Sequence, residues 1–180
     1  LNRTTQMTFS AFMSHALYTP ELGYYANGKM KFGAQGDFIT APEVSPLFGA
    51  CLARQPAEVL LRQPERPILE LGAGSGALAK SMLMAFDEMG ILPNRYLILE
   101  PSASLQNLQK EQLAAQLPEA LFALLEWVTE LPQHIVGVII ANEVIDALPV
   151  EVIRIYPNNS EQAFVVWSEE KQQFDWDWQT

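Results

Sequence analysis

The chain has 180 residues, of which 49% are hydrophobic, and its 21 acidic and 11 basic side chains give a formal net charge of −10 at pH 7. This charge disfavours binding of a phosphate backbone through a broad basic surface, and no apolar run approaches the roughly 20 residues of a membrane-spanning helix. We therefore expect a globular protein of one domain that binds neither nucleic acid nor membrane.

Residues that often form metal sites are scarce. Cys51 is the only cysteine, so a disulfide within the chain and a thiolate cluster are both excluded, and a reducing compartment fits best. The two histidines, His15 and His134, lie on an expected helix and in an expected loop without the spacing of metal ligands. The sequence thus predicts no metal.

Residues 1 to about 50 are expected to form a helix followed by a long structured loop. Thr8 or Ser10 can cap the helix. Its apolar stripe would consist of Phe9, Phe12, Met13 and Leu17. The segment from Phe32 to Pro46 is too rich in Gly and Pro for an ordinary helix or central strand, and its apolar residues indicate that it packs against the protein.

Strand and helix patterns alternate between residues 65 and 150. The expected strands are Ile68–Leu71, Tyr96–Leu99, a weaker one near Leu124–Val128, and Val136–Ile140, the clearest buried strand. Between them, large apolar residues recur at helical spacing: Leu78, Met82 and Phe86, then Leu105, Leu108 and Leu113. This alternation predicts an α/β fold with a parallel sheet covered by helices.

The last residues have a different character. Val152–Tyr156 and Ala163–Trp167 flank a Pro-Asn-Asn-Ser segment, which predicts a β-hairpin. An aromatic cluster follows without a return to alternation. We expect three zones: residues 1–50 as helix and loop, 51–150 as a Rossmann-like core, and 151–180 as a hairpin appendage or the start of a substrate subdomain.

Three alternating glycines follow the first core strand, in the segment Glu70–Ala77 (ELGAGSGA). Glycines before a helix let the backbone approach a ligand closely, and the helix N-terminus offers free amides. The same letters also fit a dinucleotide pattern, so a nicotinamide enzyme and a tight turn without ligand remain alternatives. A carboxylate at Glu70 would suit the cationic amino-acid part of S-adenosylmethionine and would repel a pyrophosphate.

Glu100 ends the second core strand. At that place a carboxylate can accept hydrogen bonds from both ribose hydroxyls of an adenosine, although a solvent-exposed glutamate is common at strand ends. Together with the glycines, Glu100 favours an adenosine-containing ligand.

Asn142, Glu143 and Asp146 follow the strand Val136–Ile140, at the carboxyl edge of the expected sheet. They are the candidate catalytic residues, because carboxylates there could orient and neutralise a substrate amine or guanidinium. Their alternative role is to cap the next helix.

Four segments together resemble the MidA-like methyltransferases. They are residues 36–49 (GDFITAPEVSPLFG), 70–76 (ELGAGSG), 141–149 (ANEVIDALP) and, in addition, 18–25 (YTPELGYY). The glycine turn is shared by many methyltransferases, whereas residues 36–49 and 141–149 are characteristic of this family. The resemblance covers about residues 8–152.

The resemblance implies a class I methyltransferase fold, a three-layer Rossmann-like sandwich, with S-adenosylmethionine as cofactor. By position, it puts Gly72, Gly74 and Gly76 under the methionine part of the cofactor and Glu100 on its ribose. It also brings the loop with Gly36, Asp37 and Thr40 over the same site.

The resemblance further implies a protein substrate. Mitochondrial members are protein arginine methyltransferases that act in complex I assembly, so we expect an arginine acceptor and a location in the mitochondrial matrix for a eukaryotic protein or the cytoplasm for a bacterial one. Family members are longer, and the strands that complete their sheet are missing here, so we expect a truncated sheet. A non-catalytic assembly factor, a cofactor-binding fragment and, more weakly, a nicotinamide oxidoreductase are the alternatives. The oligomeric state is left open.

Overall fold

The computed structural model describes residues 6–25 and 39–180, which group into two compact units. One unit contains the described residues up to Tyr25 together with Asp146–Thr180, and the other contains the described residues from Ile39 to Ile145. This grouping differs from the three zones expected from the sequence, because the N-terminal helix shares a unit with the C-terminal strands.

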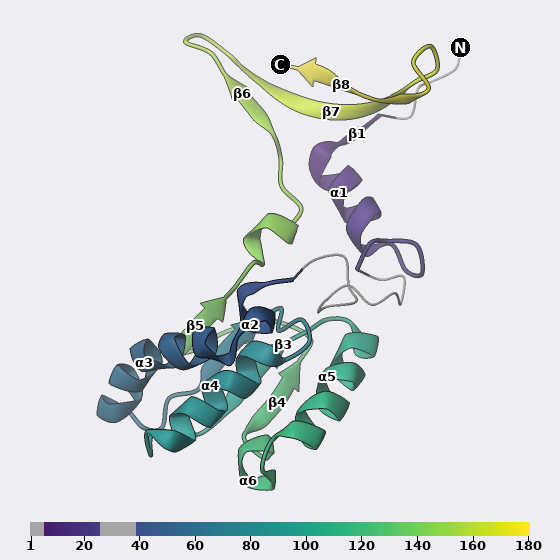
Figure 1. Cartoon of the computed structure of the whole chain (residues 1–180). Coiled ribbons are helices and arrows are strands. Elements are labelled where there is room, and N and C mark those ends of the chain that lie inside the picture. Colours follow the sequence, from purple (N-terminus) through teal and green to yellow (C-terminus); the bar gives the residue numbers. More distant parts are fainter. Residues whose placement is uncertain (1–5, 26–38) are drawn as a thin grey trace. The chain divides into compact units, whose positions relative to one another are not determined.

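The unit ending at Ile145 is built on a four-stranded parallel sheet. Its strands are β2 (Ile68–Leu71), β3 (Tyr96–Leu99), β4 (Leu125–Val128) and β5 (Val138–Ala141), in the order β4-β3-β2-β5 (Figure 1). Leu71 lies opposite both Leu99 and Ala141. The carboxyl ends of the strands therefore meet at one edge, which confirms the predicted parallel sheet.

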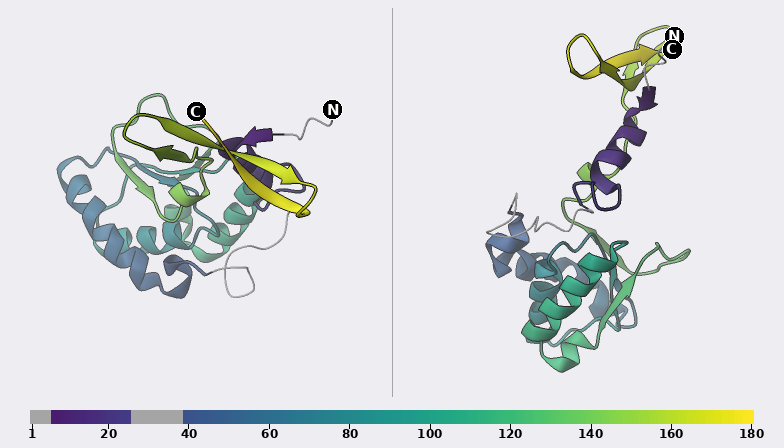
Figure 2. Two further views of the ribbon diagram at one scale, coloured as in Figure 1. Left: turned by 90° about the horizontal axis from the view of Figure 1, so that it is seen from above. Right: turned by 90° about the vertical axis from the view of Figure 1, so that its right-hand side faces the viewer.

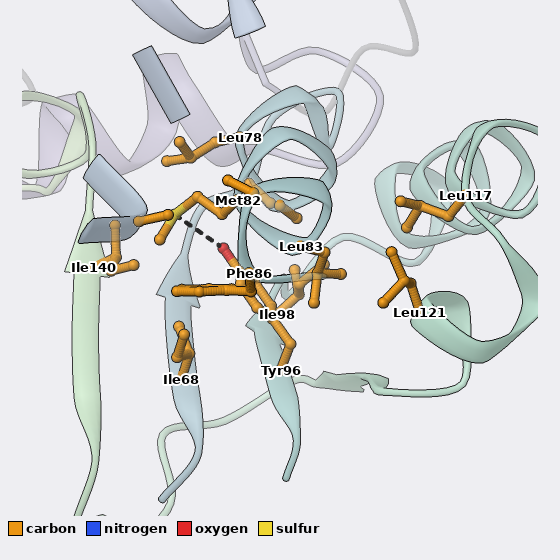
Figure 3. Close-up of a cluster of buried hydrophobic side chains, with 14 of the residues drawn as sticks. Ile68, Leu78, Met82, Leu83, Phe86, Tyr96, Ile98, Leu117, Leu121 and Ile140 are labelled. Carbon is orange, nitrogen blue, oxygen red and sulfur yellow. Dashed lines mark hydrogen bonds between the residues drawn. The ribbon is translucent and has the colours of Figure 1, made fainter. Parts of the chain in front are cut away.

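The helices of this unit pack on one face of the sheet (Figures 1 and 2). They are α2 (Ala41–Val44), α3 (Pro46–Arg62), α4 (Ala77–Glu88), α5 (Ala103–Gln116) and α6 (Glu119–Phe122). In the core, Met82 and Phe86 of α4 pack over Ile68 and Ile98 of the sheet, and all four side chains are fully buried (Figure 3). Among the described residues of this unit, these helices form a single layer on the sheet. Within residues 6–25 and 39–180, no helix is long and apolar enough to cross a bilayer.

The end of the segment Phe32–Pro46, which was expected to be loop, is helical. α2 begins after Thr40, and α3 begins at Pro46, where the Ser45 hydroxyl accepts a hydrogen bond from the amide of Leu47 at 3.2 Å. Proline is compatible with the first turn of a helix because backbone amides in that turn have no acceptor within the helix, so the missing donor costs no hydrogen bond. The expectation of a loop up to Pro46 was therefore wrong at its end, and its beginning, with Gly36 and Asp37, lies outside the described residues.

β5 lies at the edge of the sheet and is less buried than its apolar sequence predicts. Ile139 is 53% exposed, whereas Leu69 of the central strand β2 is fully buried. Among the described residues, β5 pairs only with β2. A shallow apolar groove runs along its outer side, between β5 and residues of α3 that include Phe48, Leu52 and Val59.

The other unit contains a four-stranded antiparallel sheet. Its strands are β1 (Gln6–Thr8), β6 (Ile153–Ile155), β7 (Ser160–Ser168) and β8 (Gln173–Gln179), and the short helix η1 (Ile145–Ala147) precedes β6. β6 and β7 form the predicted hairpin. β8 forms a long twisted ribbon with β7 (Figure 2), and β1 pairs with the middle of β7. The sequence patterns did not predict β1 or β8.

Helix α1 (Phe9–Tyr18) belongs to the same unit as these strands. Thr8 caps it as predicted, with its hydroxyl accepting from the amide of Ala11 at 3.2 Å. The aromatic stripe of α1 contacts β8: the ring of Phe9 lies 5.1 Å from that of Trp176, and Phe12 lies 5.0 Å from Phe174. These ring pairs attach the helix to the sheet.

Cys51 lies on α3 with its side chain exposed. We expect this thiol to react fully with an aromatic disulfide reagent in the native chain, without denaturant, because a thiol must be accessible to the reagent in order to react. The release of chromophore measures the reaction, and a Cys51→Ser variant provides the blank. A thiol that reacts only after unfolding would contradict this placement.

Candidate functional site

The turn between β2 and α4 needs glycine at three positions. Gly72, Gly74 and Gly76 have φ angles of 62°, 56° and 87°, in the left-handed region that side chains disfavour. The amide of Gly72 donates to the carbonyl of Leu99 at 3.1 Å, and that of Gly76 donates to the carbonyl of Ala73 at 2.8 Å. The backbone therefore turns sharply where the sequence predicts it.

Neighbouring segments pack closely against two of these glycines. A Cβ atom on Gly76 would lie 3.0 Å from the nearest side-chain carbon of Leu113, on α5. On Gly72 it would lie 3.2 Å from a methyl group of Val144, in the segment after β5. The turn thus lies against α5 and against the candidate segment 141–149, and its close packing leaves little room for side chains.

The turn also presents unused donors. Within the part of the chain that the structure describes, the backbone amides of Ala73, Gly74 and Ser75 have no hydrogen-bond acceptor. They precede the N-terminus of α4, where the helix dipole adds positive potential. Such amides are suited to bind an anionic group, for example a carboxylate.

Helix α2 joins the site through Glu43. The hydroxyl of Ser75 donates a short hydrogen bond to the Glu43 carboxylate and also accepts from the amide of Ala77 at 3.3 Å. Thr40, predicted to bind the cofactor, is the N-cap of α2, and its carbonyl accepts from the amide of Glu43 at 2.9 Å. No spacing pattern singled out Glu43 or Ser75, because their contact joins distant segments.

Glu70 lies inside the unit. It shares the helix-covered face of the sheet with Ile68, is 2% exposed, and accepts a hydrogen bond from the hydroxyl of Tyr96 at 2.8 Å. That hydroxyl also lies 3.7 Å from the sulfur of Met82 (Figure 3). Burial raises the pKa of Glu70 to about 7, and the Tyr96 hydrogen bond opposes the rise. Contact of Glu70 with a cofactor stays a prediction.

Glu100 follows β3 at the carboxyl edge of the sheet and is 7% exposed. One carboxylate oxygen accepts from the amide of Ser102 at 2.9 Å, and the other lies 3.5 Å from the side-chain nitrogen of Gln109. Burial raises the pKa of Glu100 above its usual value, and these two hydrogen bonds reduce the rise without cancelling it. The second oxygen, with one long hydrogen bond, keeps capacity to accept from a ligand.

Gln109 links the turn to Glu100. Besides Glu100, its side-chain amide donates to the carbonyl of Gly74 at 2.9 Å and accepts from the indole of Trp127, on β4, at 2.9 Å. No sequence motif singled out Gln109, although a signal existed: Gln109 stands midway between Leu105 and Leu113, at helical spacing within an apolar stripe.

The three candidate catalytic residues differ in burial and do not all belong to the same unit. Asn142 is half-buried directly after β5, and Glu143 is exposed with a φ angle of 53°. Because Ala141 pairs with Leu71, both residues follow the strand next to the glycine turn. Asp146 is exposed and belongs to the other unit, where it adds to the effect of burial in raising the pKa of Tyr25.

No group of three or more His, Cys, Asp or Glu side chains is arranged to hold a metal ion within residues 6–25 and 39–180. The described site consists of backbone amides, carboxylates, the Ser75 hydroxyl and the side-chain amides of Gln109 and Asn142.

A family model described as "Putative S-adenosyl-L-methionine-dependent methyltransferase" matches residues 51–180. The chain belongs to this family. This match confirms the family expected from the sequence.

Curated relatives of this chain match it over shorter regions. The mitochondrial protein arginine methyltransferase NDUFAF7 of Danio rerio is 34% identical over 119 residues, which cover 61% of this chain and 28% of the relative. The Drosophila melanogaster homolog is 36% identical over 84 residues, covering 44% and 19%. The matches thus span less than a third of the length of these relatives.

Two solved structures from Burkholderia thailandensis match nearly the whole chain. A COG1565 superfamily protein bound to S-adenosyl-homocysteine has a TM-score of 0.85 and 36% identity, covering 97% of this chain and 46% of that one. A native structure of a COG1565 superfamily protein gives 0.81 and 35%, covering 97% and 44%. These likenesses confirm the class I methyltransferase fold, and the chain spans about half the length of each structure.

Proposed function

We propose that this chain holds the methyl donor of an S-adenosylmethionine-dependent methyltransferase that methylates a nitrogen of a protein, namely an arginine side chain. The observation that carries the proposal is the glycine turn, whose amides at Ala73, Gly74 and Ser75 have no acceptor among the described residues and which one buried side chain connects to Glu100.

The residues of the turn fit the amino-acid end of this cofactor. Amides at Ala73–Ser75 would bind its carboxylate, and Gly72, Gly74 and Gly76 would let its methionine part lie against the backbone. The free acceptor capacity of Glu100 suits the ribose hydroxyls. Gly36, Asp37 and Thr40 are proposed to cover the cofactor from the preceding segment, and Glu70 to act near its cationic group.

The catalytic contribution of the chain would be positioning. S-adenosylmethionine, when bound, supplies a methyl group that its sulfonium already activates, so holding the acceptor in line matters more than strong acid or base catalysis. We assign this task to Asn142 and Glu143, next to the turn, and to Asp146. Carboxylates at positions 143 and 146 would neutralise and orient a guanidinium.

The choice of acceptor is supported by two observations. Relatives at 34% and 36% identity are named protein arginine methyltransferases, and the net charge of −10 favours a basic protein segment over a nucleic acid. The names of these relatives also place them in mitochondria. We accordingly propose the mitochondrial matrix for a eukaryotic source and the cytoplasm for a bacterial one.

Calorimetry with S-adenosylmethionine, S-adenosylhomocysteine and NAD tests the cofactor. We expect the first two to bind and NAD to give no heat. Binding of NAD alone would overturn the proposal in favour of an oxidoreductase. If none of the three ligands binds, a non-catalytic assembly role is favoured. Transfer of a labelled methyl group to arginine-containing proteins tests activity, and the label should be recovered as methylarginine.

A further inference from the structure

We propose that Gln109 is a positioning residue of the cofactor site: it fixes the carboxylate of Glu100 and the carbonyl side of the glycine turn in the geometry that the adenosine and methionine parts of the cofactor need. The proposal rests on the function proposed above, and it adds a residue on α5 that no motif of the sequence assigns.

The orientation of the Gln109 amide is determined by its partners. Trp127 can only donate through its indole nitrogen, so the atom 2.9 Å away must be the Gln109 oxygen. The nitrogen therefore faces the carbonyl of Gly74, at 2.9 Å, and the carboxylate of Glu100, at 3.5 Å. Both hydrogens of the amide are thus directed at the two parts of the site.

Burial makes this arrangement rigid. Gln109 is fully buried, with an exposed fraction of 0%, so its polar atoms cannot exchange their partners for bulk water. A buried polar group that loses its partner is strongly disfavoured, which favours the single orientation in which all three contacts form. The side chain consequently couples β4, the turn after β2 and the end of β3, which are three separate parts of the chain.

The contacts of Glu100 leave it able to accept hydrogen bonds from ribose hydroxyls. One of its oxygens is held by the amide of Ser102, and the other meets only the long contact to Gln109 among the described residues. Gln109 thereby orients the carboxylate without occupying its full acceptor capacity. Loss of the Gln109 amide would let the carboxylate rotate and would leave the carbonyl of Gly74 without its donor.

The test compares the affinities of two ligands for a variant of Gln109 and for a control variant. Gln109→Leu removes the amide. Gln112→Leu is the matched control, because it makes the same change on the same helix at a half-buried residue. Affinities are measured by calorimetry for S-adenosylhomocysteine and for its 2′,3′-dideoxy analogue, which lacks the ribose hydroxyls. Circular dichroism at the titration temperature establishes that each variant is folded.

We expect Gln109→Leu to weaken binding of S-adenosylhomocysteine by about tenfold or more, as for the loss of a buried hydrogen-bond partner. The dideoxy analogue should lose clearly less, because it makes no use of Glu100. Gln112→Leu should leave both affinities unchanged. A Trp127→Phe variant, which frees the amide to turn over without deleting it, should show the same selectivity with a smaller loss.

Equal losses for the two ligands would show that Gln109 does not act on the ribose through Glu100, and would overturn the proposal. So would unchanged affinity in Gln109→Leu while the unaltered chain binds S-adenosylhomocysteine. If Gln109→Leu does not fold, the selectivity of Trp127→Phe decides between these outcomes. Absence of binding by the unaltered chain would instead refute the proposed function, and this inference with it.

Discussion

Replacement of Gly74 by valine should lower the affinity for S-adenosylhomocysteine by about 100-fold, a loss equivalent to about 3 kcal/mol. Gly74 has a φ angle of 56° and lies between two other glycines of the turn. A branched side chain there would cover the amides that the ligand needs and would prevent close approach of the ligand to the backbone. Calorimetry with the folded variant measures the loss.

Gly90 provides the control for backbone strain. Its φ angle of 67° is close to that of Gly74, it follows the far end of α4, and a Cβ atom there would meet no atom of the described residues within 4 Å. Gly90→Val should therefore destabilise the chain by an amount similar to the strain at Gly74, about 1–3 kcal/mol, without changing affinity. Equal affinity losses in both variants would mean that strain, and not ligand contact, explains the effect.

Replacement of Glu70 by glutamine should stabilise the chain by about 3 kcal/mol at pH 8 and have little effect near pH 4. Burial raises the pKa of Glu70 from 4.5 to about 7. Between these values the folded chain binds a proton that the unfolded chain releases, so stability falls as the pH rises from about 4.5 to 7 and is level above that. Glutamine stays neutral and can still accept from Tyr96.

Urea unfolding at several pH values between 4 and 8 measures this effect. The difference between Glu70→Gln and the unaltered chain should grow with pH up to about 7, and titrations that the two chains share cancel in the difference. Glu126→Gln is the control, because Glu126 is exposed on β4 and pairs with Arg95 at 3.3 Å. A pH-independent difference for Glu70→Gln would contradict a raised pKa.

Local patterns were sufficient for the central strands. β2 and β3 begin and end at the predicted residues, because short apolar runs between prolines, glycines and polar residues have few other solutions. The glycine turn was equally clear, since left-handed backbone is a local property of Gly72, Gly74 and Gly76. The weak strand near Leu124–Val128 also formed, as β4.

Features that depend on distant partners were not predicted. β1 has only three residues, and its pairing with β7 leaves no local trace. The hydrogen bond that Glu70 accepts from Tyr96 joins two strands, and no local pattern predicts it. β8 is a different case, because the alternation of Phe174, Trp176 and Trp178 with acidic residues is itself a local strand pattern, whereas the prediction gave these residues only as an aromatic cluster.

The division into two units also has a consequence for the order of events on the ribosome. Gln6 donates a hydrogen bond to Asp177, 171 residues later, whereas the unit that ends at Ile145 is continuous in the described sequence. At a synthesis rate of about 5–20 residues per second, roughly 10–30 s separate the emergence of these two residues. For that interval Phe9 and Phe12 have no β8 to pack against, so we expect the newly made helix α1 to be a target for chaperones until β8 leaves the exit tunnel.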